Sequence, residues 1–238
     1  MSPRRHLLIA GAAWIVLSAV GIFLVSGMQI LPRIASKEAV IEDDAFVLLL
    51  ALSVPVMMFV VVGLAYSAWR FRATDSTTDG PPVHGHRGFQ GVWVGISLVL
   101  VLVLFVYGAV GLVAIRGDQS ADYEVHVQGE QWHWTYEYAN GVKSEELHLP
   151  VNQRVHLIIN SIDVIHSFWV PAFGVKQDAV PGMPTQIYMT PTDVGTYPGM
   201  CAELCGLGHT GMTTTVVVSD QAALDDWLSH APTPEPAP

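Results

Sequence analysis

Three long apolar runs fill the first half of the chain. They cover residues 7–30, 45–69 and 91–115, and no charged side chain interrupts any of them. As α-helices at about 1.5 Å per residue, runs of this length reach roughly 36–38 Å, which exceeds the ~30 Å hydrocarbon core of a bilayer. The pattern therefore predicts three membrane-spanning helices surrounded by the lipid bilayer. Pro55 interrupts the second run and predicts a kink there, because its ring removes a backbone donor.

After residue 115 the pattern changes to short segments in which apolar and polar positions alternate. These segments are rich in Val, Ile, Thr and aromatic residues and predict strands at residues 123–129, 132–138, 145–149, 154–161, 186–190 and 213–219. Asn140-Gly141 predicts a hairpin turn between the second and third strands. One short amphipathic helix follows at residues 221–228, with Asp220 as its cap. About 100 residues of short strands are typical of a β-sandwich or barrel.

The two patterns divide the chain into four parts. Residues 1–44 hold the first span and an external loop, residues 45–115 a two-helix transmembrane hairpin, residues 116–230 an external all-β domain, and residues 231–238 a Pro-rich tail that we expect to be disordered. Two interpretations stay open for the first span, a cleaved signal sequence or a retained helix. Its length exceeds the usual apolar core of a signal sequence and favours a retained helix.

Charge predicts which ends of the spans face the cytoplasm. Arg4 and Arg5 precede the first span, and Arg70, Arg72 and Arg87 flank the loop between the second and third. The positive-inside rule places both segments in the cytoplasm and the β domain outside. From residue 116 onward the chain has 15 acidic and 4 basic side chains, a net charge of −11. This charge disfavours nucleic acid as a partner and suits a basic protein, although solubility alone would also explain it.

The only two cysteines of the chain, Cys201 and Cys205, lie in a segment that also contains His209 and Met212. Thiolate, imidazole and a weak thioether are the ligands of electron-transfer copper sites. Two cysteines are one more than a single copper of this type needs, so the pattern favours two copper ions that share both sulfurs. A disulfide or half of a zinc site are the alternatives, and neither would need Met212.

A copper pair requires a second histidine from another part of the β domain. His166 follows a predicted strand and is flanked by bulky aromatic residues, which makes it the best-placed candidate. His126 and His156 lie inside predicted strands, where a lone histidine is more often structural.

Three segments of the chain, which include these candidate ligands, resemble a known family. Residues 131–138, 163–181 and 201–212 are similar to subunit II of the haem–copper cytochrome c oxidases, which carries the binuclear CuA copper centre. The resemblance covers the second and third spans and essentially the whole external domain. It implies a cupredoxin-like sandwich behind a membrane hairpin, in a multi-pass protein of a bacterial inner membrane. The copper domain would then lie on the outer, periplasmic face.

The resemblance also implies a role for each residue of the centre. Cys201 and Cys205 would bridge the copper ions, and His166 and His209 would be the terminal imidazoles. Met212 and the main-chain carbonyl of Glu203 would be the weak axial ligands. The Glu203 carboxylate would help to bind Mg²⁺ or Mn²⁺ at the interface with subunit I.

Electrons would enter through an exposed tryptophan. Trp132 occupies that position, and it alternates with three further aromatic residues, Trp134, Tyr136 and Tyr138, on one face of a predicted strand. We expect most of these aromatics to lie in the core and Trp132 to be the exposed exception. The docking acids for the electron donor would be Glu130, Asp163 and Asp178.

The implied function is electron transfer within a membrane terminal oxidase. Cytochrome c or a similar basic donor would reduce the copper centre, and haem in subunit I would receive the electron for reduction of O₂ to water. Subunits I and III would be the membrane partners, and the chain would be an enzyme only within that complex. Two alternatives stay open: the electron-delivery subunit of a CuA-containing nitric oxide reductase, and a membrane-anchored copper chaperone.

Two features depart from the family pattern. The extra N-terminal span is one. The other is Gln90, which lies where many members carry a glutamate near the cytoplasmic end of the last span. A glutamine cannot titrate, so proton uptake by that route is not predicted for this chain.

Overall fold

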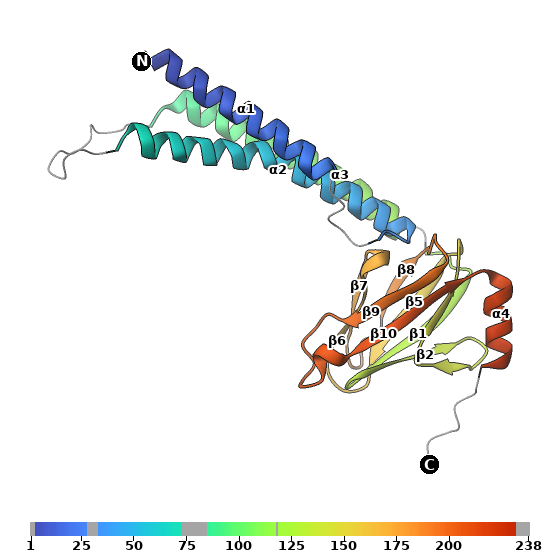
Figure 1. Ribbon diagram of the computed structural model, residues 1–238. Helices are drawn as coiled ribbons and strands as arrows, with labels where there is room; N and C mark the ends of the chain where they lie inside the picture. The colour runs from blue at the N-terminus through green and yellow to red at the C-terminus, as the bar shows by residue number, and fades with distance from the viewer. Residues whose placement is uncertain (1–2, 28–32, 73–84, 118, 232–238) are drawn as a thin grey trace. The chain divides into compact units, whose positions relative to one another are not determined.

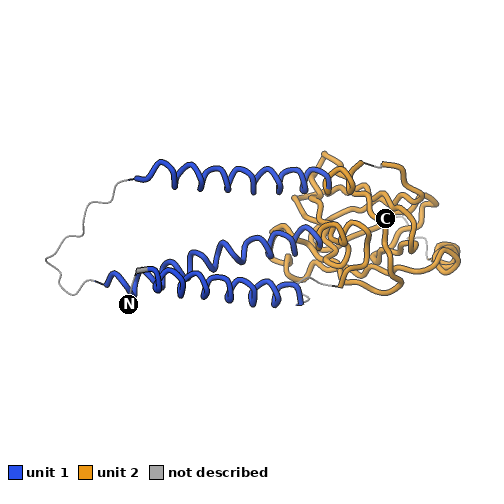
Figure 2. The backbone as a smooth tube through the Cα atoms, turned by 90° about the horizontal axis from the view of Figure 1, so that it is seen from above, with its two compact units in different colours: residues 1–30, 44–110 blue, residues 31–43, 111–238 orange. Residues whose placement is uncertain are grey.

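The computed structural model describes residues 3–27, 33–72, 85–117 and 119–231, and the chain divides into two compact units (Figure 2). The first unit comprises residues 1–30 and 44–110, and the second comprises residues 31–43 and 111–238. Residues 31–43 therefore group with the β domain rather than with the first span. The predicted tail lies outside the described residues, apart from Ala231.

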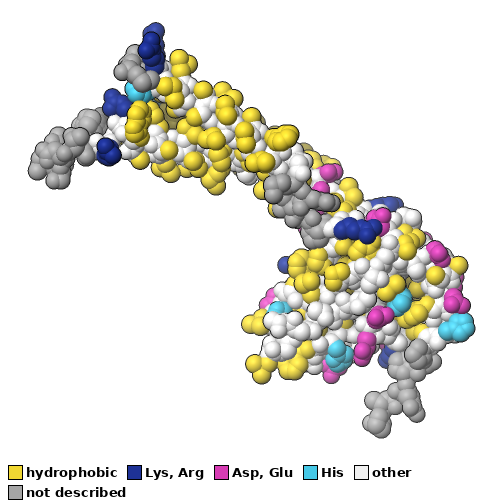
Figure 3. All heavy atoms as spheres, viewed as in Figure 1, with side chains coloured by type: hydrophobic (Ala, Val, Ile, Leu, Met, Phe, Trp, Pro, Cys, Tyr) yellow, Lys and Arg dark blue, Asp and Glu magenta, His cyan; other side chains and the backbone are white. Residues whose placement is uncertain are grey.

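Three helices in the described residues are long and apolar enough to cross a membrane, which agrees with the three predicted spans. They are α1 (Pro3–Gly27), α2 (Lys37–Arg70) and α3 (Arg87–Arg116). Hydrophobic side chains cover the helical unit, and Lys and Arg side chains gather at one end of it (Figure 3). None of the residues of α3 is buried. A helix that is apolar on all sides and unburied in the monomer is suited to lipid or to another membrane helix.

Helix α1 packs closely on α2. The Trp14 indole N–H donates to the carbonyl of Pro55 over 2.8 Å, and its ring meets Phe59 edge-on. A Cβ atom at Gly21 would come within 2.6 Å of Val54 Cγ1, so the two backbones approach where Gly21 has no side chain. Helix α2 continues through Pro55, and the predicted kink stays a prediction.

The predicted external loop at residues 31–44 is wrong from Lys37 onward, where α2 begins. Ser36 caps this helix, since its hydroxyl accepts a 3.0 Å hydrogen bond from the Ala39 N–H. Lys37, Glu38 and Ala39 are good helix formers, so the charged stretch forms the first turns of α2 instead of a loop. Two backbone bonds, from Ala35 N–H to Ala172 and from Lys37 N–H to Thr190, tie this segment to the β domain.

The β domain is a sandwich of two five-stranded sheets in the described residues (Figure 1). One sheet has the order β3-β2-β1-β5-β8 and the other the order β4-β10-β9-β6-β7. The strands are β1 (Tyr123–Glu130), β2 (His133–Tyr138), β3 (Lys143–Ser144), β4 (Leu147–Pro150), β5 (Val155–Ser161), β6 (His166–Val170), β7 (Val175–Ala179), β8 (Thr185–Met189), β9 (Gly195–Cys201) and β10 (Thr213–Ser219). Alternate residues of these strands face inward and form one core.

The six predicted strands are all present, but the sequence patterns missed β3, β6, β7 and β9. Strand β6 is almost entirely buried and therefore lacks alternation, and β9 contains Pro198 and Gly199. The turn at Gly141 is present, with a positive φ of 83°, but it joins β2 to the short strand β3. The predicted hairpin partner at residues 145–149 corresponds to β4, which pairs with β10 in the other sheet, so that part of the prediction is wrong. Helix α4 (Gln221–His230) begins as predicted at Asp220, whose carboxylate accepts from the Ala223 N–H.

Candidate metal centre

Two neighbouring strands bring the ligand residues to one end of the sandwich. His166 opens β6 and Cys201 closes β9, and the pairing of Phe168 with Cys201 places these strands side by side. The loop between β9 and β10 then carries the remaining candidate ligands, Cys205, His209 and Met212. Its ends are joined by a 2.9 Å hydrogen bond from the Cys201 N–H to the Met212 carbonyl.

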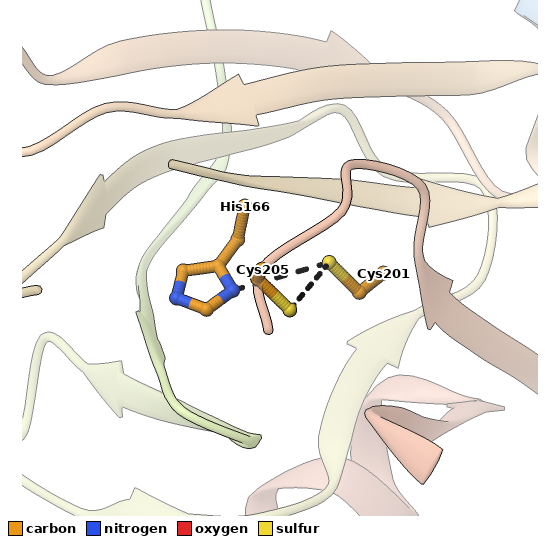
Figure 4. Close-up of side chains that lie close together, drawn as sticks. All are labelled: His166, Cys201 and Cys205. Carbon is orange, nitrogen blue, oxygen red and sulfur yellow. Dashed lines mark hydrogen bonds between the residues drawn. The ribbon is translucent and has the colours of Figure 1, made fainter. Parts of the chain in front are cut away.

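The two thiols face each other, with Sγ atoms 3.8 Å apart (Figure 4). The His166 imidazole lies beside the first of them, with Nδ1 3.9 Å from Cys201 Sγ. The main-chain carbonyl of Glu203 lies on the same sulfur at 3.2 Å. One half of the site therefore combines a thiol, an imidazole and a carbonyl oxygen.

The other half is built around Cys205. Its Sγ lies 3.6 Å from His209 Nδ1 and 3.7 Å from Met212 Sδ. Cys201, Cys205 and Met212 are buried, and His166 is completely buried. Each half thus offers a thiol, an imidazole and one weak ligand, and this donor set fits two copper ions that share the sulfurs.

Both cysteines are free thiols in this structure. Burial, with the neighbouring Cys201 thiol as a further cause, raises the pKa of Cys205 to about 11. A metal ion that binds here must therefore displace a thiol proton, and its affinity will rise with pH.

Asp163 orients the buried histidine. Its Oδ1 lies 2.9 Å from His166 Nε2, while Oδ2 accepts a 2.7 Å hydrogen bond from the Gln131 N–H. Burial alone would raise the pKa of Asp163, but hydrogen bonds, first that to His166 and then those from Val164, Gln131 and Ser161, outweigh it and hold the pKa at about 2. An Nε2–H that donates to this carboxylate leaves the Nδ1 lone pair free for a metal.

Sequence reasoning placed Asp163 among the docking acids and missed its contact with His166. The signal available was an aspartate three residues before a candidate ligand histidine. Its docking role stays a prediction, as do those of Glu130 and Asp178. Glu130 lies 3.5 Å from His133, and Asp178 is exposed on β7.

Trp132 lies against Gly206 and Gly208 of the loop between β9 and β10, residues 202–212, which is called the metal loop below. It shares the β1–β2 turn with Gln131 and is 41% exposed, whereas Trp134, Tyr136 and Tyr138 are buried, as expected. The Gln131 side chain, which sequence reasoning also missed, donates a 2.6 Å hydrogen bond to the Cys205 carbonyl. The turn is therefore fastened to the loop that carries the ligands.

Two further residues singled out from the sequence, the Glu203 side chain and Gln90, do not contribute to this cluster. The Glu203 side chain is exposed, and the only close group of three or more His, Cys, Asp or Glu ligands among the described residues is His166, Cys201 and Cys205. Gln90 lies in the exposed first turn of α3, where His86 Nδ1 accepts from the Phe89 N–H.

Comparisons with known proteins point to one family. The family described as "Cytochrome C oxidase subunit II, periplasmic domain" matches residues 141–219. Cytochrome c oxidase subunit 2 of a Synechocystis species is 30% identical over 270 residues, which cover 92% of this chain and 81% of the relative. The protein of the same name from Cereibacter sphaeroides is 30% identical over 231 residues, covering 79% and 74%.

A solved structure was also matched. The crystal structure of the periplasmic domain of cytochrome oxidase subunit II from Bradyrhizobium japonicum is 30% identical, covers 47% of this chain and 94% of that domain, and superposes with a TM-score of 0.46. Both relatives carry the name cytochrome c oxidase subunit 2, and this chain covers 81% and 74% of their lengths. The chain therefore belongs to the cytochrome c oxidase subunit II family.

Proposed function

We propose that this chain is the subunit of a membrane terminal oxidase that receives electrons from a basic donor of the cytochrome c type. The electrons pass to haem in the catalytic subunit, where O₂ is reduced to water. Family membership supports this role, and the two matching halves of the metal centre are the observation that carries it. The catalytic subunit, and subunit III beside it, would contact the apolar helices.

The centre's own residues explain why it would transfer electrons well. When bound by Cys201, Cys205, His166 and His209, a pair of copper ions would supply a one-electron carrier. Cys201 and His166 sit at the ends of paired strands, and Asp163 holds the imidazole from behind. Ligands fixed in this way move little when the charge of the site changes, and a small reorganisation favours fast transfer.

The surface around the centre supports a direction for the electron. Trp132 is the exposed aromatic residue that touches the metal loop, so we assign it to electron uptake. Glu130 and Asp178 would attract a basic donor. The exposed Glu203 carboxylate would supply one ligand to Mg²⁺ or Mn²⁺, and the remaining ligands would come from the catalytic subunit.

The membrane placement follows from charge and helix length. Arg4 and Arg5 at the start of α1, and Arg70 and Arg87 at the ends of α2 and α3, would face the cytoplasm. The β domain would then lie on the outer face of a bacterial inner membrane, with α1 retained as a third span.

The decisive experiment is metal analysis and electron paramagnetic resonance of the full chain loaded with copper. We expect two copper ions per chain and a seven-line hyperfine pattern, because one unpaired electron is shared by two copper nuclei. Cys201→Ser and Cys205→Ser should each abolish that pattern. His126→Ala, which changes an exposed histidine on β1, is the matched control and should keep it.

Other outcomes would favour the rival functions. A single, readily exchangeable copper ion with a four-line pattern would contradict the proposal and support an anchored chaperone. A copper pair in a complex whose catalytic subunit reduces nitric oxide, and not O₂, would support the nitric oxide reductase alternative.

A further inference from the structure

The indole of Trp132 rests on two glycines of the metal loop. A Cβ atom built at Gly208 would overlap Trp132 Cδ2 and would lie 2.6 Å from Trp132 Cγ. One built at Gly206 would lie 3.3 Å from Cζ2 of the same ring. The ring therefore spans both glycines, between Cys205 and His209.

The two glycines are needed for different reasons. Gly206 has a φ of 120°, a conformation that residues with a Cβ rarely adopt. Gly208 has a φ of −88° and a ψ of 6°, which are accessible to any residue. The backbone conformation at position 208 therefore does not require glycine. Glycine is needed there because the Trp132 indole occupies the space that a side chain would take.

The indole cannot avoid a side chain at 208 by a small adjustment. The atoms in the way are Cγ and Cδ2, close to the root of the Trp132 side chain, so the whole ring would have to swing. The backbone next to Trp132 is fixed by two hydrogen bonds of Gln131. Its side-chain amide donates to the Cys205 carbonyl, and its N–H donates to Asp163.

From this geometry we infer that Gly208 is a positioning residue for Trp132. Its missing side chain lets the indole lie in van der Waals contact with the loop segment that joins Cys205 to His209. An alanine at this position lifts the ring from the loop and lengthens the gap between the surface and the metal ligands. The consequence for electron transfer rests on the proposed function, whereas the steric role does not.

The steric role is tested in the full chain without metal, labelled with 5-fluorotryptophan. Trp132→Phe identifies the fluorine resonance of Trp132 among those of the seven tryptophans. We expect Gly208→Ala to shift that resonance. Gly211→Ala should not, because a Cβ there meets nothing within 4 Å. A Trp132 resonance that is unchanged in Gly208→Ala overturns the inference.

The functional consequence is tested in the assembled oxidase. Gly208→Ala should slow reduction of the copper centre by the donor severalfold while the paramagnetic resonance spectrum is kept, and Gly211→Ala should not. In a Trp132→Ala background, Gly208→Ala should have no further effect, since the clash is gone. Full additivity of the two changes would contradict the inference.

The outcomes also separate this inference from the proposed function. If Trp132→Ala leaves donor oxidation unchanged, the role of Trp132 in electron uptake is wrong, and the fluorine shift still decides the steric role. If Gly208→Ala weakens copper binding, Trp132→Ala should restore it by removing the clash, and failure to restore it counts against the inference.

Discussion

At the scale of single residues, the contact between Asp163 and His166 controls the chemistry of the site. The imidazole is completely buried, with Nε2 on the carboxylate and Nδ1 facing the Cys201 sulfur. Without the carboxylate the ring could rotate or carry its proton on Nδ1, and either change would remove a metal ligand.

We therefore expect Asp163→Ala to lower copper affinity by about 10- to 100-fold, as is usual when the partner of a ligand histidine is lost. Competition with a chromogenic copper chelator measures this. Asp178→Ala is the control, because Asp178 is another exposed acid of the domain, on strand β7. Equal affinities of the two variants would refute the orienting role.

At the scale of elements, Arg154, the residue before strand β5, joins the start of α2 by a buried ion pair and the end of α3 by a hydrogen bond. Arg154 Nη1 lies 3.0 Å from Glu38 Oε1, and Nη2 donates to the Ile115 carbonyl over 3.1 Å. The other Glu38 oxygen accepts from the Thr190 N–H over 2.8 Å. The Glu38 and Arg154 side chains are only 5% and 17% exposed.

Breaking this pair should destabilise the β domain. For Glu38→Ala we expect a loss of about 3–5 kcal/mol in the free energy of unfolding, because the Arg154 guanidinium loses this buried carboxylate and the Thr190 N–H loses this acceptor. Urea unfolding of the full chain in detergent, followed by near-ultraviolet circular dichroism, measures it. Lys37→Ala, the exposed neighbour, should change stability little, and a Glu38→Ala variant as stable as that control would contradict the prediction.

Helix α4 contacts the sandwich through two stacked rings, one of which is a titratable histidine. His148 of β4 lies on Trp227 with ring centroids 3.8 Å apart. Burial lowers the pKa of His148, and the nearby Glu146 only partly opposes this. The folded state therefore favours the neutral imidazole. Its contribution to stability is complete above the unfolded pKa and is lost as the pH falls through the folded pKa.

The expected result is a loss of stability in acid that depends on this residue. Between about pH 8 and about pH 5, the free energy of unfolding should fall more in the unsubstituted chain than in His148→Phe, which keeps the stack without titrating. Denaturant unfolding at several pH values provides the comparison. Identical pH dependences would show that His148 does not contribute.

At the scale of the whole molecule, the acidity of the β domain should influence the rate of donor binding. The chain carries a net charge of −10, and from residue 116 onward it is −11. A basic donor would be attracted over distances comparable to the Debye length, which shrinks from about 30 Å to about 8 Å between 0.01 M and physiological ionic strength.

Turnover with a basic cytochrome should therefore fall as salt rises. Replacing Glu130 and Asp178 with their amides should flatten that dependence, while Asp226→Asn on α4 should leave it steep. A turnover that is independent of salt in the unsubstituted complex would argue against docking by these acids.

The local features of the molecule could be predicted from the sequence, because their patterns lie within a few residues. Features of this kind are the three long apolar helices, the turn at Gly141, the start of α4 and the grouping of Cys201, Cys205, His209 and Met212. Strands β6 and β9 were missed because one is buried on both faces and the other contains proline and glycine.

Contacts between distant segments were decided by the tertiary structure alone. His166 could be named as a candidate ligand from the sequence. Three further contacts could not be predicted: that of Asp163 with His166, that of Gln131 with the Cys205 carbonyl, and that of Trp132 with Gly208. They depend on how β1, β6 and β9 meet at one end of the sandwich. Such contacts arise from sheet pairing and packing across many residues. No local pattern encodes them, since each partner by itself resembles an ordinary loop or turn residue.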